Sequence, residues 1–187
     1  MTLLSLRMPL VLAASFSLFA AAPPGWLLAG SAPQSYETGV DRAVTYTGLP
    51  SAYLKAKSSV KPQGFGTMMQ SLQASDYKGK RIRFSAQVKS DSVVDWAGLW
   101  MRVDEGNQVS AFDNMQRRPI QGTADWTPYS VVLDVSQGAT GISFGILLAG
   151  TGSVWLSDVK FEVVDPQTPV TGPVTPAAPA NLDFEKN

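Results

Sequence analysis

The chain has 187 residues, of which 44% are hydrophobic and 10% aromatic, and its 15 basic residues balance its 15 acidic residues. This length and apolar content predict one domain with a sizeable core. Because the sequence has no Cys and no His, disulfides, thiol nucleophiles, Cys/His zinc sites and imidazole bases are excluded. No cluster of Lys and Arg could follow a phosphate backbone, which argues against nucleic acid as a partner.

The N-terminal residues resemble a targeting segment. Arg7 is followed by the apolar run MPLVLAASFSLFAAA, residues 8–22. Such a run is typical of a secretory signal peptide and is short for a membrane span. We expect residues 1–22 to be a signal peptide cut within residues 20–22, with a buried N-terminal helix as the alternative. The mature protein would then be secreted, in the periplasm, without a membrane anchor.

The rest of the chain predicts short strands broken by Gly, Pro, Asn and Asp, with no long helical periodicity. The clearest runs lie at residues 44–47, 52–56, 81–89, 99–103, 129–135, 142–148 and 154–164. In the third run, Ile82, Phe84, Ala86 and Val88 alternate with polar residues, which is the pattern of a half-buried strand. The segment GTGS, residues 150–153, predicts a hairpin between the last two runs. Together these runs predict an all-β antiparallel β-sandwich or barrel over residues 23–165.

The segment DWAGLWMRVD, residues 95–104, places a tryptophan on the outer side of a strand. If Leu99, Met101 and Val103 face the core, Trp100 and Arg102 face outward. An outward tryptophan is explained either by a ligand that stacks on it or by a loop that covers it.

The segment AFDNMQRRPIQGTADW, residues 111–126, combines aromatic rings with Arg, Asn and Asp. This mixture is typical of small-molecule and sugar sites. The alternative is a structural loop that covers Trp100, with Arg102 paired to a nearby carboxylate. The sequence leaves both open. The predicted ligand-binding residues are Trp100, Arg102, Asp113, Asn114, Gln116, Arg118 and Trp126.

Three other patterns predict less. Ser143 lies in GISFG, which matches the spelling of a nucleophile elbow, but strand alternation continues through it and no His is available as a base. A pair of carboxylates could act as a hydrolase, which is the weaker alternative to a protein with no catalytic residue. Asp158 could help bind a structural calcium ion, and no other cofactor is expected.

The C-terminal residues change in composition. Residues 166–180 are rich in Pro, Thr and Ala and predict an extended tether. Residues 181–187, NLDFEKN, again resemble a strand.

Three segments carry a resemblance to a known family: YKGKRIRFSAQVKSDSVVDWAGLWMRVD, AFDNMQRRPIQGTADWTPYSVVLDV and ISFGILLAGTGSVWLSDVKFEVVD. They resemble a galactose-binding-like, carbohydrate-binding-module-like jelly roll. Similar domains occur beside AraC-type helix-turn-helix regulators and in secreted peptidase or esterase chains. The resemblance implies about nine strands and a non-catalytic role. A transcriptional-regulator label on a relative would rest on DNA-binding helices, which this sequence does not predict.

The tail departs from the family pattern. In similar domains a segment like NLDFE precedes the P-x-G-W start and forms the first strand, whereas here PPGW, residues 23–26, follows the predicted signal peptide directly. We therefore predict that the tail docks as the missing strand and inserts Leu182 and Phe184 into the sandwich. Docking in cis would give a monomer, and docking in trans a strand-exchanged homo-oligomer.

These observations predict a secreted, non-catalytic binding module for a carbohydrate or another small molecule. The alternative is a structural or protein-interaction domain whose loop residues bind only one another.

Overall fold

The computed structural model describes residues 21–58, 61–172 and 182, so the predicted signal peptide lies almost wholly outside the described residues. The described part contains two short 3-10 turns, η1 (Pro33–Ser35) and η2 (Ser75–Tyr77), and none of its helices could cross a membrane. Its strands are β1 (Leu27–Gly30), β2 (Tyr36–Tyr46), β3 (Leu49–Ala56), β4 (Phe65–Gln73), β5 (Arg81–Glu105), β6 (Gln108–Asp113), β7 (Ile120–Asp134), β8 (Gly141–Ala149) and β9 (Ser153–Val164). All pairings are antiparallel, which confirms the all-β prediction.

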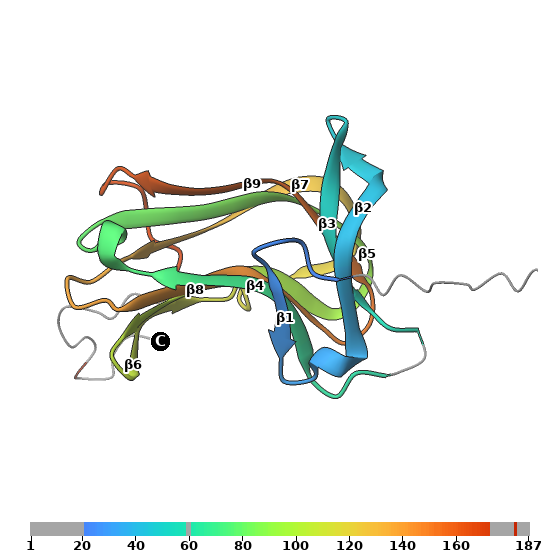
Figure 1. Ribbon diagram of the computed structural model, residues 1–187, viewed down its shortest axis with the longest axis horizontal. Coiled ribbons are helices and arrows are strands. Elements are labelled where there is room, and N and C mark those ends of the chain that lie inside the picture. Colours follow the sequence, from blue (N-terminus) through green and yellow to red (C-terminus); the bar gives the residue numbers. More distant parts are fainter. Residues whose placement is uncertain (1–20, 59–60, 173–181, 183–187) are drawn as a thin grey trace, which may run out of the picture.

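The strands form one sheet that folds back on itself into two layers (Figure 1). The strand order is β1-β4-β8-β5-β9-β3-β2, and β6 and β7 also pair with β5. The first half of β5 pairs with β9, whereas the second half pairs with β8 and β6. We call the layer of β1, β4, β8, β6 and the second half of β5 the β8 layer. The layer of β7, β9, β3, β2 and the first half of β5 is the β9 layer.

β5 passes from one layer to the other without a break. The sequence predicted two separate strands at residues 81–89 and 99–103, but the residues between them continue to pair. The register with β7 shifts between Ser90 and Val93 and again between Val93 and Ala97, and Ser92 has a positive φ of 53°. Such bulges bend a strand and increase its twist, which lets β5 serve both layers.

The core lies between the layers and follows the predicted alternation. Phe84 from the first half of β5 and Leu99 from the second are both 0% exposed. Phe144 of β8 lies 4.9 Å from Phe84 and 4.6 Å from Phe161 between ring centroids, at distances typical of favourable aromatic pairs. The aromatic rings therefore join β5, β8 and β9 across the sandwich.

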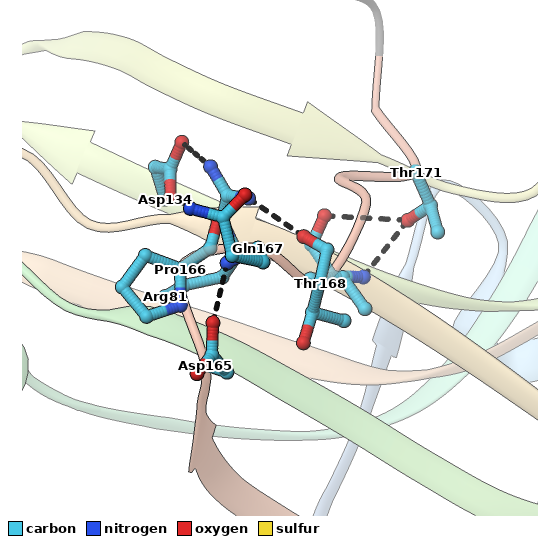
Figure 2. A network of polar contacts seen from close by, with 8 residues as sticks. Arg81, Asp134, Asp165, Pro166, Gln167, Thr168 and Thr171 are labelled. Carbon is cyan, nitrogen blue, oxygen red and sulfur yellow. Dashed lines mark hydrogen bonds and ion pairs between the residues drawn. The ribbon is translucent and has the colours of Figure 1, made fainter.

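The residues after β9 remain bound to the sandwich (Figure 2). We call residues 165–172 the C-terminal strap. Arg81 forms an ion pair of 2.7 Å with Asp134, and its Nη1 donates to the carbonyl oxygens of Pro166 and Thr168 at 2.5 and 2.6 Å. The backbone N–H of Thr171 donates to the carbonyl of Val132 at 3.0 Å. The first part of the predicted tether is thus held against the edge of β7.

The predicted docking of the tail receives no support from the described residues. Leu182 is 76% exposed, rather than buried as docking would require. Phe184 lies outside the described residues, so its docking stays a prediction.

Candidate functional site

The outer face of the β8 layer carries a cavity of about 630 Å³. Its floor is formed by side chains that share one face because their strands are in register: Trp100 lies opposite Gly145, and Thr67 lies opposite Leu147. The aromatic lining residues are Phe65, Trp96, Trp100 and Phe112, and the polar ones are Thr67, Asp95, Arg102 and Asn114. The cavity thus combines flat apolar surfaces with a few polar groups, as ligand sites do.

Trp100 lies on the predicted outer face but is only 9% exposed, so its ring is not directed into water as predicted. Its Nε1 donates to Thr67 Oγ1 at 2.7 Å, and Thr67 Oγ1 donates to the carbonyl of Ile146 at 2.8 Å. The ring reaches from β5 across β8 to β4, and Gly145, which it passes, has no side chain to lift it. A Cβ at Gly145 would also collide with the carbonyl oxygen of Met68. The tryptophan is therefore fixed in one orientation beneath the cavity.

The other aromatic residues of the cavity were not predicted. Phe65 and Phe112 are 37% and 41% exposed and stand at the rim. Trp96 precedes Trp100 by two alternations of β5 and therefore shares its face. The same alternation would have identified Trp96, whereas Phe65 and Phe112 come from β4 and β6, for which the sequence predicted no strand.

The loop after β6 closes one side of the cavity and is held by its own residues. Asp113 forms an ion pair of 2.6 Å with Arg118 and accepts the backbone N–H of Met115 at 2.9 Å. Met115, 1% exposed, lies over Gly98, where a Cβ would stand 2.9 Å from the Met115 Cβ. The structural alternative therefore describes Asp113 and Arg118 well, while Asn114 lines the cavity.

The environment of Asp113 favours its charged form. Burial opposes ionisation, but hydrogen bonds from Arg118, Thr171 and the backbone of Met115, together with the charge of Arg118, outweigh burial and lower the pKa of Asp113 below its usual value of 3.8. The carboxylate thus joins the loop to the C-terminal strap.

Charged groups at the two ends of the cavity have different partners. Arg102, 44% exposed in its side chain, forms an ion pair of 3.0 Å with Asp104 on the same face of β5. Asp95 lies near Tyr36, whose hydroxyl oxygen is 2.9 Å from the carbonyl oxygen of Gly64 and 3.1 Å from that of Gly150, so that its one proton is shared between these two acceptors. Burial, followed by the charge of Asp95, raises the pKa of Tyr36 to about 12, so the phenol stays protonated and holds both loops.

Two residues from the sequence analysis, Trp126 and Ser143, do not line the cavity. Trp126 lies in the β9 layer, where it packs against Tyr46 at 5.5 Å between ring centroids and donates from Nε1 to the carbonyl of Thr45. It is therefore separated from Trp100, since β7 carries it into the other layer. Ser143 lies within β8 and is hydrogen-bonded to Ser71 at 2.8 Å, as expected for a strand residue.

Asp158 does not support the calcium prediction. Its carboxylate forms an ion pair of 3.0 Å with Lys160. Among the residues that the structure describes, no group of three or more acidic side chains could hold a metal ion.

No family model matches. The chain is 44% identical over 167 residues to the uncharacterized HTH-type transcriptional regulator YbfP of Bacillus subtilis (strain 168). The match includes 87% of this chain but only 57% of that protein, so the chain spans little more than half the length of this relative.

The solved structures that resemble the protein include carbohydrate-binding modules. The CBM22-1 xylan-binding domain of Xyn10C from Paenibacillus barcinonensis has a TM-score of 0.54 at 16% identity, with 78% of this chain and 90% of that domain covered. The CBM22-1–CBM22-2 tandem domain of the same protein has a TM-score of 0.57 at 15% identity, covering 81% and 44%. The enzymatically active domain of tailspike protein 4 from bacteriophage CBA120 has a TM-score of 0.56 at 13% identity, covering 75% and 20%. These likenesses show the fold, which is the galactose-binding-like, carbohydrate-binding-module-like jelly roll that the sequence resembled.

Proposed function

We propose that the protein is a non-catalytic binding module that holds a glycan in the cavity on the β8 layer. One observation carries the proposal: Trp100 lies fixed beneath the cavity, with its only ring N–H already used by Thr67. The ring can therefore offer an apolar surface without an unsatisfied donor. Sugars present apolar C–H faces and polar edges, and a site of aromatic rings with Arg, Asn and Asp matches both.

The size of the cavity supports a small ligand or a short oligosaccharide. Its volume of about 630 Å³ lies within the usual range for ligand pockets, which is roughly 300–1,000 Å³. Two structural neighbours are a xylan-binding domain and a pair of CBM22-1 and GH10 modules in complex with xylohexaose. Xylohexaose is therefore the first ligand to test.

The lining residues support binding rather than catalysis. Glycoside hydrolysis needs two carboxyl groups on opposite sides of the scissile bond. Among the lining residues, Asp95 is the only carboxylate, and Ser143 is bonded within the sheet. Because one neighbour is described as an enzymatically active domain, release of reducing sugar should be assayed alongside binding, and we expect none.

Calorimetric titration of the full chain with xylohexaose and a panel of neutral oligosaccharides tests the proposal. We expect saturable binding that Trp100→Ala weakens at least tenfold. Trp126→Ala is the matched control, because it removes a tryptophan of the β9 layer and should leave the affinity unchanged. Binding that survives Trp100→Ala, or no binding to any member of the panel, would contradict the proposal.

We also propose that the protein is secreted, which the apolar residues 8–22 support. Mass spectrometry of the protein expressed with its full N-terminus should show loss of about the first 22 residues, as the sequence predicts for signal cleavage. An intact N-terminus on protein recovered from the cytoplasm would overturn this part.

A second candidate function is ligand sensing for a regulatory chain. It is favoured by the 44% identity to part of a protein named as a transcriptional regulator. The matching region of that relative can be expressed and titrated with any ligand that binds here. A shared ligand would support sensing by the relative, and a different ligand would separate the two functions.

A further inference from the structure

A second, smaller cavity adjoins the first. It has a volume of about 260 Å³. It shares Phe112 and Asn114 with the cavity on the β8 layer, which we call the glycan cavity after its proposed function. Its other lining residues are Asp113, Gln116, Arg117, Arg118, Thr171 and Gly172. Because two residues belong to both cavities, a ligand longer than one sugar unit could extend from Trp100 past Phe112 into the second cavity.

The second cavity carries excess positive charge. Arg117 and Arg118 contribute two positive groups, whereas Asp113 is its one carboxylate and is paired with Arg118. Arg118 uses three N–H donors in bonds to Asp113 and the carbonyl of Ser130, out of the five that a guanidinium group has. Arg117 is exposed and takes part in no ion pair between described residues. Both side chains therefore retain donors for a ligand.

The C-terminal strap forms the far wall of this cavity. Thr171 and Gly172 line it, and Thr171 is fixed because its Oγ1 accepts the backbone N–H of Val132 at 2.8 Å. Upstream, Arg81 and Asp134 hold the strap at Pro166 and Thr168 (Figure 2). The wall is thus part of the folded domain.

Gly172 is required for the close approach of the strap. A Cβ at this position would lie 2.9 Å from a methyl group of Leu133 and 3.0 Å from the carbonyl oxygen of Phe112. Because these contacts are tighter than ordinary packing, a side chain would push the strap away and open the cavity. The sequence therefore keeps the wall next to the two arginines.

We propose that the second cavity is a subsite for the carboxylate of an acidic sugar, so that the ligand is an oligosaccharide with a uronic acid unit. This inference rests on the proposed function, since the neutral part of the ligand lies on Trp100 and Phe112. A carboxylate matches the planar donor fork of arginine, and charge-assisted bonds of this type are stronger than those to neutral hydroxyls. The preformed Asp113–Arg118 pair orients one arginine, and Arg117 supplies the charge that is not already neutralised.

The test uses pairs of ligands in which one member carries carboxylates and the other is neutral. Hexagalacturonate and its fully methyl-esterified form have the same sugar skeleton, and a xylo-oligosaccharide with a glucuronate branch can be paired with xylohexaose. Titrations on the full chain at low salt should show at least one acidic ligand binding about tenfold or more tightly than its neutral partner. Arg117→Gln should remove most of this preference without changing the affinity for the neutral ligand. Arg42→Gln, an exposed arginine of β2, is the matched control and should change neither.

The outcomes separate the subsite from the function on which it rests. Equal affinity within both pairs, or a preference that Arg117→Gln leaves intact, overturns the acidic subsite while neutral binding still supports the glycan cavity. A preference that is lost in Arg117→Gln and weakens with added salt supports the subsite, because an exposed charge interaction is screened. No binding by any of the four ligands overturns both proposals.

Discussion

In the first half of β5 the charged outer side chains form ion pairs with side chains of the neighbouring strands, whereas in the second half the outer side chains line a cavity. Arg83 forms an ion pair with Glu162 of β9, and Lys89 forms one with Asp125 of β7, both at 2.9 Å. In the second half, the corresponding face presents Trp100 and Arg102 to the cavity on the β8 layer. The inner faces do not differ in this way, since both halves are apolar and buried.

The difference arises from the strands beside β5. In the β9 layer the neighbouring strands supply carboxylates that neutralise the outer charges. In the β8 layer the neighbouring strand β8 supplies Gly145, over which the ring of Trp100 can pass, and β4, the next strand beyond it, supplies Thr67, which accepts the ring N–H. One strand therefore stabilises the fold along its whole inner face and lines a cavity along only half of its outer face.

The largest expected effect on stability comes from truncating a buried side chain on the inner face of either half of β5. Phe84→Ala should lower the free energy of unfolding by about 3–5 kcal/mol and Leu99→Ala by about 2–5 kcal/mol, because both side chains are 0% exposed and leave cavities. Urea titrations followed by tryptophan fluorescence measure both. A loss below about 1 kcal/mol in either half would show that its core is loosely packed.

A smaller effect is expected from Gly98 on the outer face of the second half. In Gly98→Val the new Cβ would lie 2.8 Å from the carbonyl oxygen of Asn114, so the loop must move. We expect a stability loss of about 1–3 kcal/mol and a weaker glycan affinity. Gln87→Val places the same residue on the outer face of the first half, where a side chain is already accommodated, and should leave the affinity unchanged. Equal effects of the two substitutions would contradict the comparison.

The pH dependence of the loop should follow Asp113. Because its pKa in the folded protein lies below the usual 3.8, its ionised form stabilises the folded state above that pH. This contribution is lost as the pH falls through the lowered pKa. Asp113→Asn should therefore lower the melting temperature at pH 7, through a loss of about 1–3 kcal/mol for a disrupted buried charge pair, and narrow the gap to wild type near pH 2–3. A gap that stays constant down to pH 2 would show that the carboxylate charge is not responsible.

The smallest effect is expected at Arg83. Its ion pair with Glu162 is partly exposed to solvent: the side chain of Arg83 is 40% exposed and that of Glu162 is 41% exposed. Such pairs contribute about 0–1 kcal/mol. Arg83→Ala should therefore change the unfolding free energy little and the glycan affinity not at all. A large loss of affinity would show that the first half of β5 also contributes to binding.

The sequence predicted the parts that depend on one strand at a time. Alternation alone placed Leu99, Met101 and Val103 in the core and Trp100 and Arg102 on the opposite face. It could not predict the ring orientation of Trp100, since this depends on Thr67 of β4, a strand that no clear pattern predicted. β4 begins with FGTMM, in which glycine and methionine obscure the alternation.

Grouping residues by closeness in sequence was less reliable. Trp126 was predicted at the site because it ends the same segment, residues 111–126, but β7 carries it into the other layer. Asp113 and Arg118 were predicted to bind ligand. The structure pairs them with each other, which the sequence did not require, and their part in ligand binding stays a prediction. Burial and pairing of this kind become visible only when the backbone is traced in space.

The position of β5 also determines when the chain can fold. Its first residue, Arg81, is paired with Asp134 of β7 and with Val164 at the end of β9. These partners are far apart in sequence, and sandwiches dominated by such contacts fold slowly, over roughly milliseconds to seconds. When β5 has just been synthesised, the strands that pair with both edges of its first half, β7 and β9, have not yet been made. The two layers can close only after β9 has been synthesised, so the order of translation keeps this domain unfolded almost to the end of its own synthesis.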